Sequence, residues 1–191
     1  FIWNIMTIAF WLFDYDRGKK EGSSRIRGRW VIKYWPEVEE YQIGKDYDAI
    51  IFQKIYFPEF VENYKGIKIL DLCDPDWFNG IPIGRTIESC DAVTCSSEGL
   101  YEFLKQMTKK PVRYIPDRLD LDFMKQKKIH KGSARTCVWF GYSHNAHCLK
   151  ETIKRLKEYD LDLITITDRD ISSEICGTIN ADYRDRIKFV K

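Results

Sequence analysis

Short apolar runs alternate with helical patterns along most of the chain. The runs are rich in β-branched and aromatic residues and hardly alternate with polar ones, which is typical of strands covered on both faces of a sheet. They lie at residues 7–13, 48–52, 67–72, 91–95, 112–115, 137–140, 162–166 and 187–190. Strands that alternate with helices predict a mostly parallel sheet with right-handed crossovers. The pattern therefore predicts an α/β, Rossmann-like fold.

Two of the intervening segments carry an apolar stripe at helical spacing. The first stripe consists of Leu100, Phe103, Leu104 and Met107. Ser97 precedes it as a typical N-cap, and Glu98 falls in the first turn. The second stripe consists of Leu149, Ile153 and Leu156. We expect Asn145 to cap this second helix and Glu151 to pair with Arg155 four residues later.

A basic stretch without a core pattern separates two parts of the chain. It runs over residues 125–135 and contains Gly132 and Ser133. We therefore expect a first domain at 1–124, a linker at 125–135 and a second domain at 136–191. The second part holds about three strands, fewer than the five or six of a typical sheet. We expect it to be an incomplete second Rossmann-like domain.

Composition and charge exclude several classes of protein. With 44% hydrophobic residues, the chain can bury an ordinary core. The 31 basic and 29 acidic residues leave a net charge of +2, so we expect no nucleic-acid partner. Six Cys residues occur singly, which favours reduced thiols and a cytoplasmic location. The apolar residues 1–13 are too few to span a bilayer, which takes about 20, so we predict a first strand there. Peripheral membrane contact stays open.

The loop after the first strand is the first candidate site. Its Ser and Arg residues and the free N–H groups of a following helix suit an anion. The candidate binding residues are Ser23, Ser24, Arg25 and Arg27. The loop has neither the dinucleotide-binding glycine pattern nor a Walker motif, which argues against NAD binding and ATP hydrolysis. The alternative is a solvated loop and an ordinary helix cap.

An acidic turn follows the strand at 67–72 and is the second candidate. Asp74 and Asp76 would lie at the carboxyl end of a parallel strand, where ligands of such sheets bind. Carboxylates there can orient a hydroxyl, act as a base or bind Mg²⁺. We take Asp74 as the candidate catalytic residue and Asp76 as a binding residue. The alternative is a plain acidic turn.

The third candidate follows the strand at 137–140 and suits a phosphate, because a helix begins there. Its residues are Gly141, Tyr142, Ser143, His144 and Asn145. A metal interpretation would join His144 to His147 and Cys148, but the spacing matches no zinc motif. We therefore expect no bound metal and no cofactor. The alternative is simple helix capping.

Taken together, these segments resemble the GT-B glycosyltransferases, in particular the large retaining group that uses nucleotide sugars. The segments beginning Ser23-Ser-Arg-Ile-Arg-Gly and Cys90-Asp-Ala-Val-Thr-Cys-Ser-Ser-Glu resemble the first helix and a late strand of their first domain. Val112-Arg-Tyr-Ile-Pro-Asp-Arg-Leu-Asp is similar to the passage that ends this domain. Trp139-Phe-Gly-Tyr-Ser-His-Asn and Arg186-Ile-Lys-Phe-Val resemble parts of the donor domain.

The resemblance implies two facing Rossmann-like domains, with the acceptor mainly on the first and the donor mainly on the second. It places Ser24, Arg25, Arg27 and Asp74 near the cleft, and residues 141–143 near the donor diphosphate. The family's Gly-Gly in the first loop is replaced here by Gly22-Ser-Ser, and its Glu-rich sugar-nucleotide motif is absent.

The resulting hypothesis is a glycosyltransferase, or a fragment of one, that moves a sugar from a nucleoside-diphosphate sugar to an acceptor hydroxyl without a metal. The implied partners are a nucleotide sugar and a saccharide, lipid-linked or protein acceptor. One alternative is a non-catalytic Rossmann-like module that binds a nucleotide, saccharide or protein. Another is a different α/β enzyme such as a sugar epimerase.

Overall fold

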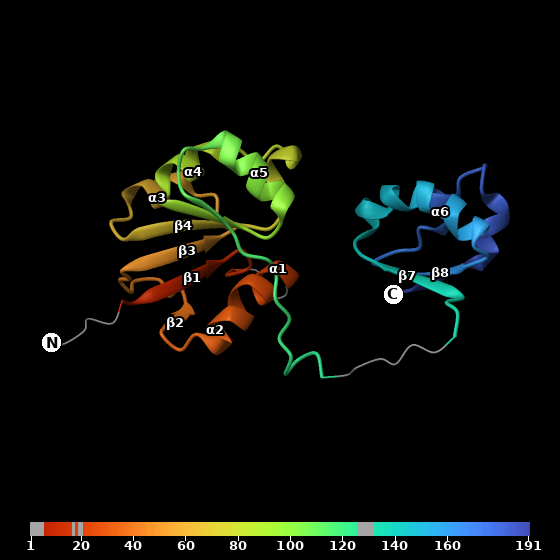
Figure 1. The fold of residues 1–191 in the computed structure, drawn as a ribbon, viewed down its shortest axis with the longest axis horizontal. Coiled ribbons are helices and arrows are strands. Elements are labelled where there is room, and N and C mark those ends of the chain that lie inside the picture. Colours follow the sequence, from red (N-terminus) through yellow and green to blue (C-terminus); the bar gives the residue numbers. More distant parts are fainter. Residues whose placement is uncertain (1–5, 17, 19–20, 126–131) are drawn as a thin grey trace. The chain divides into compact units, whose positions relative to one another are not determined.

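The structure is a computed structural model, and it describes residues 6–16, 18, 21–125 and 132–191. The chain forms two compact units, residues 1–126 and 127–191 (Figure 1). Part of the predicted linker, residues 126–131, lies outside the described residues. Within the described residues, no helix has the length and hydrophobicity needed to cross a membrane.

The first unit is built on a six-stranded sheet in which all neighbouring strands are parallel. The strand order is β2-β1-β3-β4-β5-β6. The strands are β1 (Ile8–Leu12), β2 (Val38–Glu40), β3 (Ala49–Gln53), β4 (Ile67–Leu72), β5 (Ala92–Cys95) and β6 (Val112–Tyr114). This arrangement confirms the predicted α/β, Rossmann-like fold. The chain leaves β1 toward β2 and then returns to β3 on the other side, so the order reverses between β1 and β3. In open parallel sheets this reversal opens a crevice at the carboxyl ends of the two strands.

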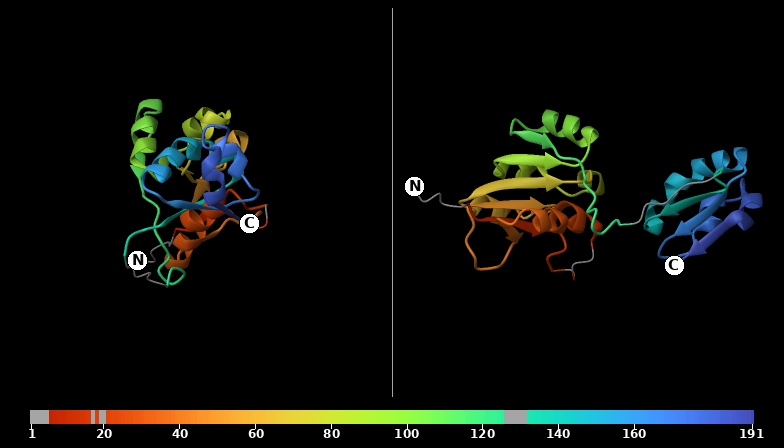
Figure 2. Two further views of the ribbon diagram at one scale, coloured as in Figure 1. Left: turned by 90° about the vertical axis from the view of Figure 1, so that its right-hand side faces the viewer. Right: turned by 60° about the horizontal axis from the view of Figure 1, so that its bottom comes forward.

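Helices cover both faces of this sheet (Figure 1), and Figure 2 gives two further views of the ribbon. One face carries α3 (Pro58–Asn63), α4 (Gly84–Ser89) and α5 (Glu98–Met107). The main core lies beneath them, where Phe52, Leu70 and Leu104 are fully buried. The other face carries one helical segment formed by α1 (Gly22–Ser24), the π-helical η1 (Arg25–Arg29) and α2 (Trp30–Tyr34).

Close packing of this helical segment on β1 depends on Gly28. A Cβ atom at Gly28 would lie 2.1 Å from Cδ2 of Leu12, which no real side chain tolerates. The missing side chain therefore lets η1 approach β1, and the close approach brings the side chains of residues 24–29 onto the end of the sheet.

Aspartates at the strand starts tie neighbouring strands together. Asp48 precedes β3, and its Oδ2 accepts hydrogen bonds from the N–H and hydroxyl of Thr7, at 2.8 and 2.9 Å. Asp91 precedes β5 and accepts from the N–H of Lys68 in β4 at 2.8 Å. Asp48 and Asp91 therefore accept from free donors of the neighbouring segment, whereas Asp162, at the start of the run at 162–166, accepts from the side chain of Arg186 at 2.7 Å.

The second unit has a smaller parallel sheet in the order β7-β8-β9. Its strands are β7 (Thr136–Phe140), β8 (Asp162–Ile166) and β9 (Ile187–Val190). One face is covered by α6 (Leu149–Glu158) and α7 (Ser172–Cys176), and two 3₁₀ helices, η3 (Ser143–Cys148) and η4 (Ala181–Arg186), complete the unit. Ile153, Leu163 and Tyr183 form its buried core. Val138, Phe140 and Ile166, on the opposite face, are exposed.

The predicted helix starts have different outcomes. Ser97 caps α5 as predicted, because its hydroxyl accepts a hydrogen bond from the N–H of Leu100 at 3.3 Å. Asn145 does not cap α6: it lies inside η3, and the residue before α6 is Cys148, which makes no side-chain cap.

The predicted ion pair on α6 is also wrong. Glu151 pairs with Lys154 at 3.0 Å, and Arg155 pairs with Glu158 at 2.8 Å. Both observed pairs have i,i+3 spacing, which brings side chains on a helix as close as i,i+4 spacing does.

Candidate functional site

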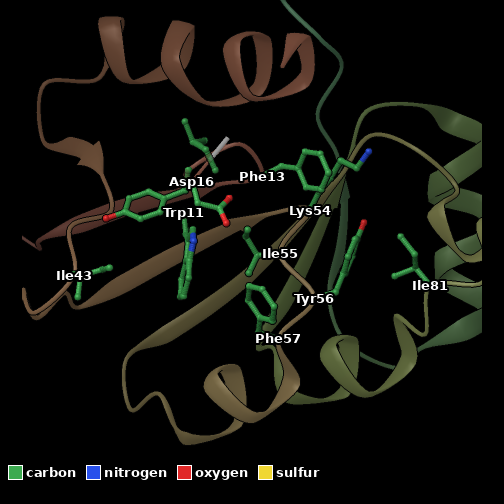
Figure 3. A pocket seen from close by; sticks show the side chains of 11 residues that line it. Trp11, Phe13, Asp16, Ile43, Lys54, Ile55, Tyr56, Phe57 and Ile81 are labelled. Carbon is green, nitrogen blue, oxygen red and sulfur yellow. The ribbon is translucent and has the colours of Figure 1, made fainter. Parts of the chain in front are cut away.

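A cavity of about 460 Å³ opens where the strand order reverses (Figure 3). It lies at the carboxyl ends of β1 and β3, which is the place that the topology of an open parallel sheet predicts for a ligand. Its lining residues are Trp11, Leu12, Phe13, Tyr15, Asp16, Ile43, Lys54, Ile55, Tyr56, Phe57 and Ile81. The volume falls within the range of about 300–1,000 Å³ that is usual for small-molecule sites.

A polar cluster stands at one end of this cavity and joins the ends of β3 and β4. The ammonium group of Lys54 lies 2.6 Å from Oδ2 of Asp74 and 3.3 Å from Oδ2 of Asp76. The hydroxyl of Tyr56 donates to the same oxygen of Asp76 at 2.5 Å. The ring of Phe13, from the end of β1, lies 5.1 Å from the Lys54 ammonium. The predicted pair Asp74 and Asp76 is thus part of a larger cluster.

Lys54 reaches this position through an unusual backbone conformation. Its φ of 54° is in the left-handed region, which costs an L-residue with a side chain roughly 1–2 kcal/mol. The N–H of Lys54 donates to the carbonyl of Asp71 at 3.0 Å and so continues the β3–β4 ladder into the turn. Strained residues held in this way cluster at functional sites. The turn directs the Lys54 side chain toward Asp74 and Asp76 instead of continuing the strand.

The charges of the cluster are strongly coupled. Burial alone would raise the pKa of the Asp74 carboxyl, but the adjacent Lys54 ammonium outweighs burial and holds that pKa below its usual value. Burial likewise opposes the charge of Lys54, and Asp74 with its neighbours raises the pKa of the Lys54 ammonium. For Tyr56, burial and the hydrogen bond to Asp76 both raise the pKa of the phenol. Asp74 is therefore a weak base in this state and is better suited to hold a hydroxyl or a cation than to remove a proton at neutral pH.

Of the four predicted first-loop residues, Ser24 and Arg27 are buried, Ser23 is partly exposed and Arg25 is exposed. The hydroxyl of Ser24 is buried, donates to Oε1 of Gln53 at 3.0 Å and accepts from the N–H of Asp14 at 3.3 Å. Ser24 thus ties the end of β1 to the end of β3. Ser23 is partly exposed at the start of the same helical segment. The guanidinium of Arg25 packs 5.7 Å from the ring centroids of Trp30 and Phe123.

Arg27 lies beneath the sheet, away from the cavity. Its guanidinium binds Asp71 with two hydrogen bonds of 2.8 and 2.5 Å. It also donates to the carbonyl of Ile115 at 2.7 Å and to Asp117 at 2.9 Å. Its side chain is only 5% exposed, and its charge is neutralised inside the protein. Arg27 therefore holds the chain segment after β6 against the sheet.

The turn after β7 contains the predicted residues of the second unit. The N–H and hydroxyl of Ser143 donate to the two carboxylate oxygens of Asp168, at 2.7 and 2.9 Å. These hydrogen bonds hold the pKa of Asp168 well below its usual value. Tyr142 and His144 stack with ring centroids 5.7 Å apart, and Tyr142 is 62% exposed.

The remaining two residues of this turn have backbone roles. A Cβ at Gly141 would meet the Trp139 ring at 3.1 Å, and the N–H of Asn145 donates to the carbonyl of Tyr142 at 2.9 Å. The turn is therefore well ordered by internal contacts. Its outer surface carries the stacked pair of Tyr142 and His144.

Sequence reasoning missed Lys54 and Tyr56, together with the aromatic wall that Trp11, Phe13 and Phe57 supply to the cavity. The rule that selected Asp74 and Asp76, polar residues after a buried strand, also selects Gln53 and Lys54 after the run at 48–52. Among the residues that the structure describes, no group of three or more His, Cys, Asp or Glu side chains is placed to hold a metal ion.

Comparisons with known proteins do not assign this chain to a family. No family model matches the chain, and no curated protein matches it. Among solved structures, a chain of the "Glycosylation Associate Protein (Gap123) complex from Streptococcus agalactiae" aligns with a TM-score of 0.37 and 17% identity. The alignment covers 74% of this chain and 33% of that chain, so this chain spans about a third of the other's length.

Proposed function

We propose that this chain belongs to a glycosyltransferase, that its first unit binds the acceptor, and that its second unit contributes to binding of a nucleoside-diphosphate sugar. The reaction would transfer the sugar from the diphosphate to an acceptor hydroxyl. The observation that carries the proposal is the cavity between the ends of β1 and β3, with the Lys54–Asp74–Asp76 cluster at its edge.

The chemistry of the cavity supports a polyhydroxylated ligand. Aromatic rings from Trp11 and Phe13 supply flat apolar surfaces, on which the C–H faces of a sugar ring can lie. The cluster supplies groups that both donate and accept hydrogen bonds. In this proposal Tyr56 and Lys54 bind acceptor hydroxyls directly, and Asp74 and Asp76 hold those two side chains in place.

The second unit supports the donor role through its polar turn at the carboxyl end of β7. This turn opens a helical segment, whose first N–H groups favour an anion such as a diphosphate. The exposed ring of Tyr142 offers a stacking surface for a base or sugar. Stabilisation of the departing diphosphate by such donors would be the main contribution to catalysis.

One observation favours the alternative of a binding module without turnover. Asp168 occupies both donors of Ser143, so a diphosphate would have to displace or bypass an internal carboxylate. A protein that only holds a saccharide in the first unit needs no such displacement.

Calorimetry with UDP-, GDP- and ADP-glucose tests the donor site on the 191-residue chain. We expect one of the three to bind, and Tyr142→Ser to weaken its binding by about tenfold, as the loss of one stacking contact of about 1.4 kcal/mol would do. Tyr159→Ser is the matched control, because Tyr159 is 71% exposed in the same unit and lies outside the turn.

Turnover is measured on the natural protein in full, as release of the nucleoside diphosphate in the presence of saccharide acceptors. Binding of a nucleotide sugar with acceptor-dependent release supports the transferase. If the protein binds a saccharide but no nucleotide sugar, the glycosyltransferase is refuted and the binding module without turnover stands. If it binds neither class of ligand, both hypotheses are refuted.

A further inference from the structure

The cavity between β1 and β3 is polar at one end and apolar over most of its remaining wall. Figure 3 shows the ammonium of Lys54 and the hydroxyl of Tyr56 close together at one end, with Ile43 at the other. Asp16 directs a carboxylate into the region between them (Figure 3). A cavity with one polar end and one apolar end suits a narrower class of ligands than the acceptor role alone implies.

The polar end is complementary to an uncharged hydroxyl. Lys54 and Tyr56 are neighbours because both bind Oδ2 of Asp76. An ammonium has three N–H donors, of which the hydrogen bond to Asp74 takes one, and a phenol that donates to Asp76 keeps lone pairs that can accept. A hydroxyl can accept from the ammonium and donate to the phenol at the same time. A phosphate monoester at neutral pH has little to donate, and an amine cation has nothing to accept with.

Charge at this end also disfavours an anion. One ammonium faces two carboxylates, so the cluster of Lys54, Asp74 and Asp76 carries a net charge of about −1 when all three groups are ionised. A phosphate or carboxylate head group would meet this charge at close range in a partly dry cavity, where repulsion is only weakly screened. This charge therefore favours a neutral head group.

The opposite end of the cavity exposes apolar side chains to solvent. Phe57 is 58% exposed and Ile43 is 78% exposed, although both line the cavity. Ile55 and Trp11 continue the apolar wall between this rim and the polar end. Covering such an apolar rim with a hydrocarbon group is favourable, because it removes apolar surface from water.

We propose that the cavity binds an uncharged glycoside with an apolar aglycone, with sugar hydroxyls at Lys54 and Tyr56 and the aglycone against Phe57 and Ile43. This proposal rests on the proposed acceptor role and narrows the acceptor to an amphiphile with a neutral head group. It makes the first unit select its substrate by two features, the hydroxyl at one end and the hydrocarbon at the other.

The test is titration calorimetry with methyl, butyl and hexyl β-glucosides, β-galactosides and α-mannosides, all below their micellar concentrations. Full burial of one methylene raises affinity about fourfold, and we expect the hexyl glycosides to bind at least tenfold more tightly than the methyl glycosides. Hexyl phosphate is the charged-head probe, and we expect it to bind at least tenfold more weakly than the best hexyl glycoside.

Two variants locate the two halves of the ligand. Phe57→Ser should remove most of the dependence on chain length and leave methyl glycoside binding unchanged. Phe78→Ser is its matched control, because Phe78 is 79% exposed and is not part of the cavity wall. Tyr56→Phe should weaken all glycosides about tenfold through loss of the accepting oxygen. A circular dichroism unfolding curve for each variant shows whether it is folded.

The outcomes separate this proposal from the acceptor role on which it rests. If methyl and hexyl glycosides bind equally well, the apolar aglycone is refuted and the acceptor role stands. Hexyl phosphate binding as tightly as the hexyl glycosides would overturn the neutral head group. If hexanol binds as tightly as the glycosides, or if no glycoside binds, the acceptor role is refuted together with this proposal.

Discussion

The buried pair of Arg27 and Asp71 allows a quantitative prediction about the first unit. Replacing Arg27 with Met keeps much of the side-chain volume and removes the charge. The Asp71 carboxylate would then remain at 4% exposure, with the hydroxyl of Thr94, at 2.6 Å, as its remaining hydrogen-bond donor. Removing one partner of a buried ion pair typically costs about 3–5 kcal/mol, because the other charge is left uncompensated.

This cost is large against the roughly 5–15 kcal/mol that stabilises a folded domain. Arg27→Met would also free the carbonyl of Ile115 and the carboxylate of Asp117, so the segment after β6 would lose two anchors. At roughly 4 °C per kcal/mol for a unit of this size, we expect its melting temperature to fall by about 12–20 °C.

The double variant Arg27→Met with Asp71→Leu removes both charges and is the decisive control. Apolar replacement of a whole buried pair is often neutral or stabilising, so the double variant should recover most of the loss. The assay is urea unfolding followed by tryptophan fluorescence. In the second unit Trp139 is the sole tryptophan, so the signal comes mainly from the first unit.

Two results would refute this reasoning. One is a loss below about 1 kcal/mol for Arg27→Met, which is the range of a solvent-exposed pair. The other is a double variant whose loss equals the sum of the two single losses, because independent sites add in this way and coupled ones do not.

Three further predictions concern other parts of the molecule. Ser97→Ala should destabilise the first unit by about 1 kcal/mol in urea unfolding, because it removes the cap of α5; no change would contradict the cap. The folded-state pKa of Asp168 is depressed, so its contribution to the second unit is full above about pH 5 and is lost as the pH falls through about 4 and below. Unfolding of the second unit, followed by the NMR signals of its backbone amides, should show this acid sensitivity, and Asp168→Asn should reduce it. Iodoacetamide at pH 8 should label exposed Cys148 before buried Cys90, whose thiol pKa burial raises to about 12, and peptide mass spectrometry showing the reverse order would contradict the packing.

Most strands of the two units, and the longest helix of the first unit, were predictable because their signals are local. The predicted run at 67–72 coincides with β4, and the runs at 162–166 and 187–190 coincide with β8 and β9. Composition alone indicated each of these strands, but the expectation that both faces are covered is wrong for the second unit, where Val138, Phe140 and Ile166 are exposed. Ser97 likewise marks the start of α5, because the hydrogen bond that it accepts comes from Leu100, which lies in the same short segment of sequence. The short elements β2, α3 and α4 were not predicted, because three residues of strand or six of helix cover less than two periods of the hydrophobic pattern.

The candidate site was predictable only in part. Asp74 and Asp76 follow from the rule that polar residues after parallel strands line a crevice. The sequence alone favoured Arg27 as a cleft residue for the same reason, and the structure places it outside the cavity between β1 and β3, in an ion pair with Asp71. Arg27 is buried because Asp71, 44 positions away, offers it a carboxylate, and because Gly28 lets the helical segment settle on β1.

The amino-acid sequence by itself determined the class of fold, since hydrophobic periodicity is a property of neighbouring residues and parallel strands need helical crossovers. Only the tertiary structure decided which polar groups face a ligand and which neutralise each other inside. Those outcomes depend on charge partners from distant segments, such as Lys54 with Asp74 and Arg27 with Asp71. A buried charge is stable only where its partner arrives with good geometry, and the strand order that brings the partner there is a property of the whole sheet.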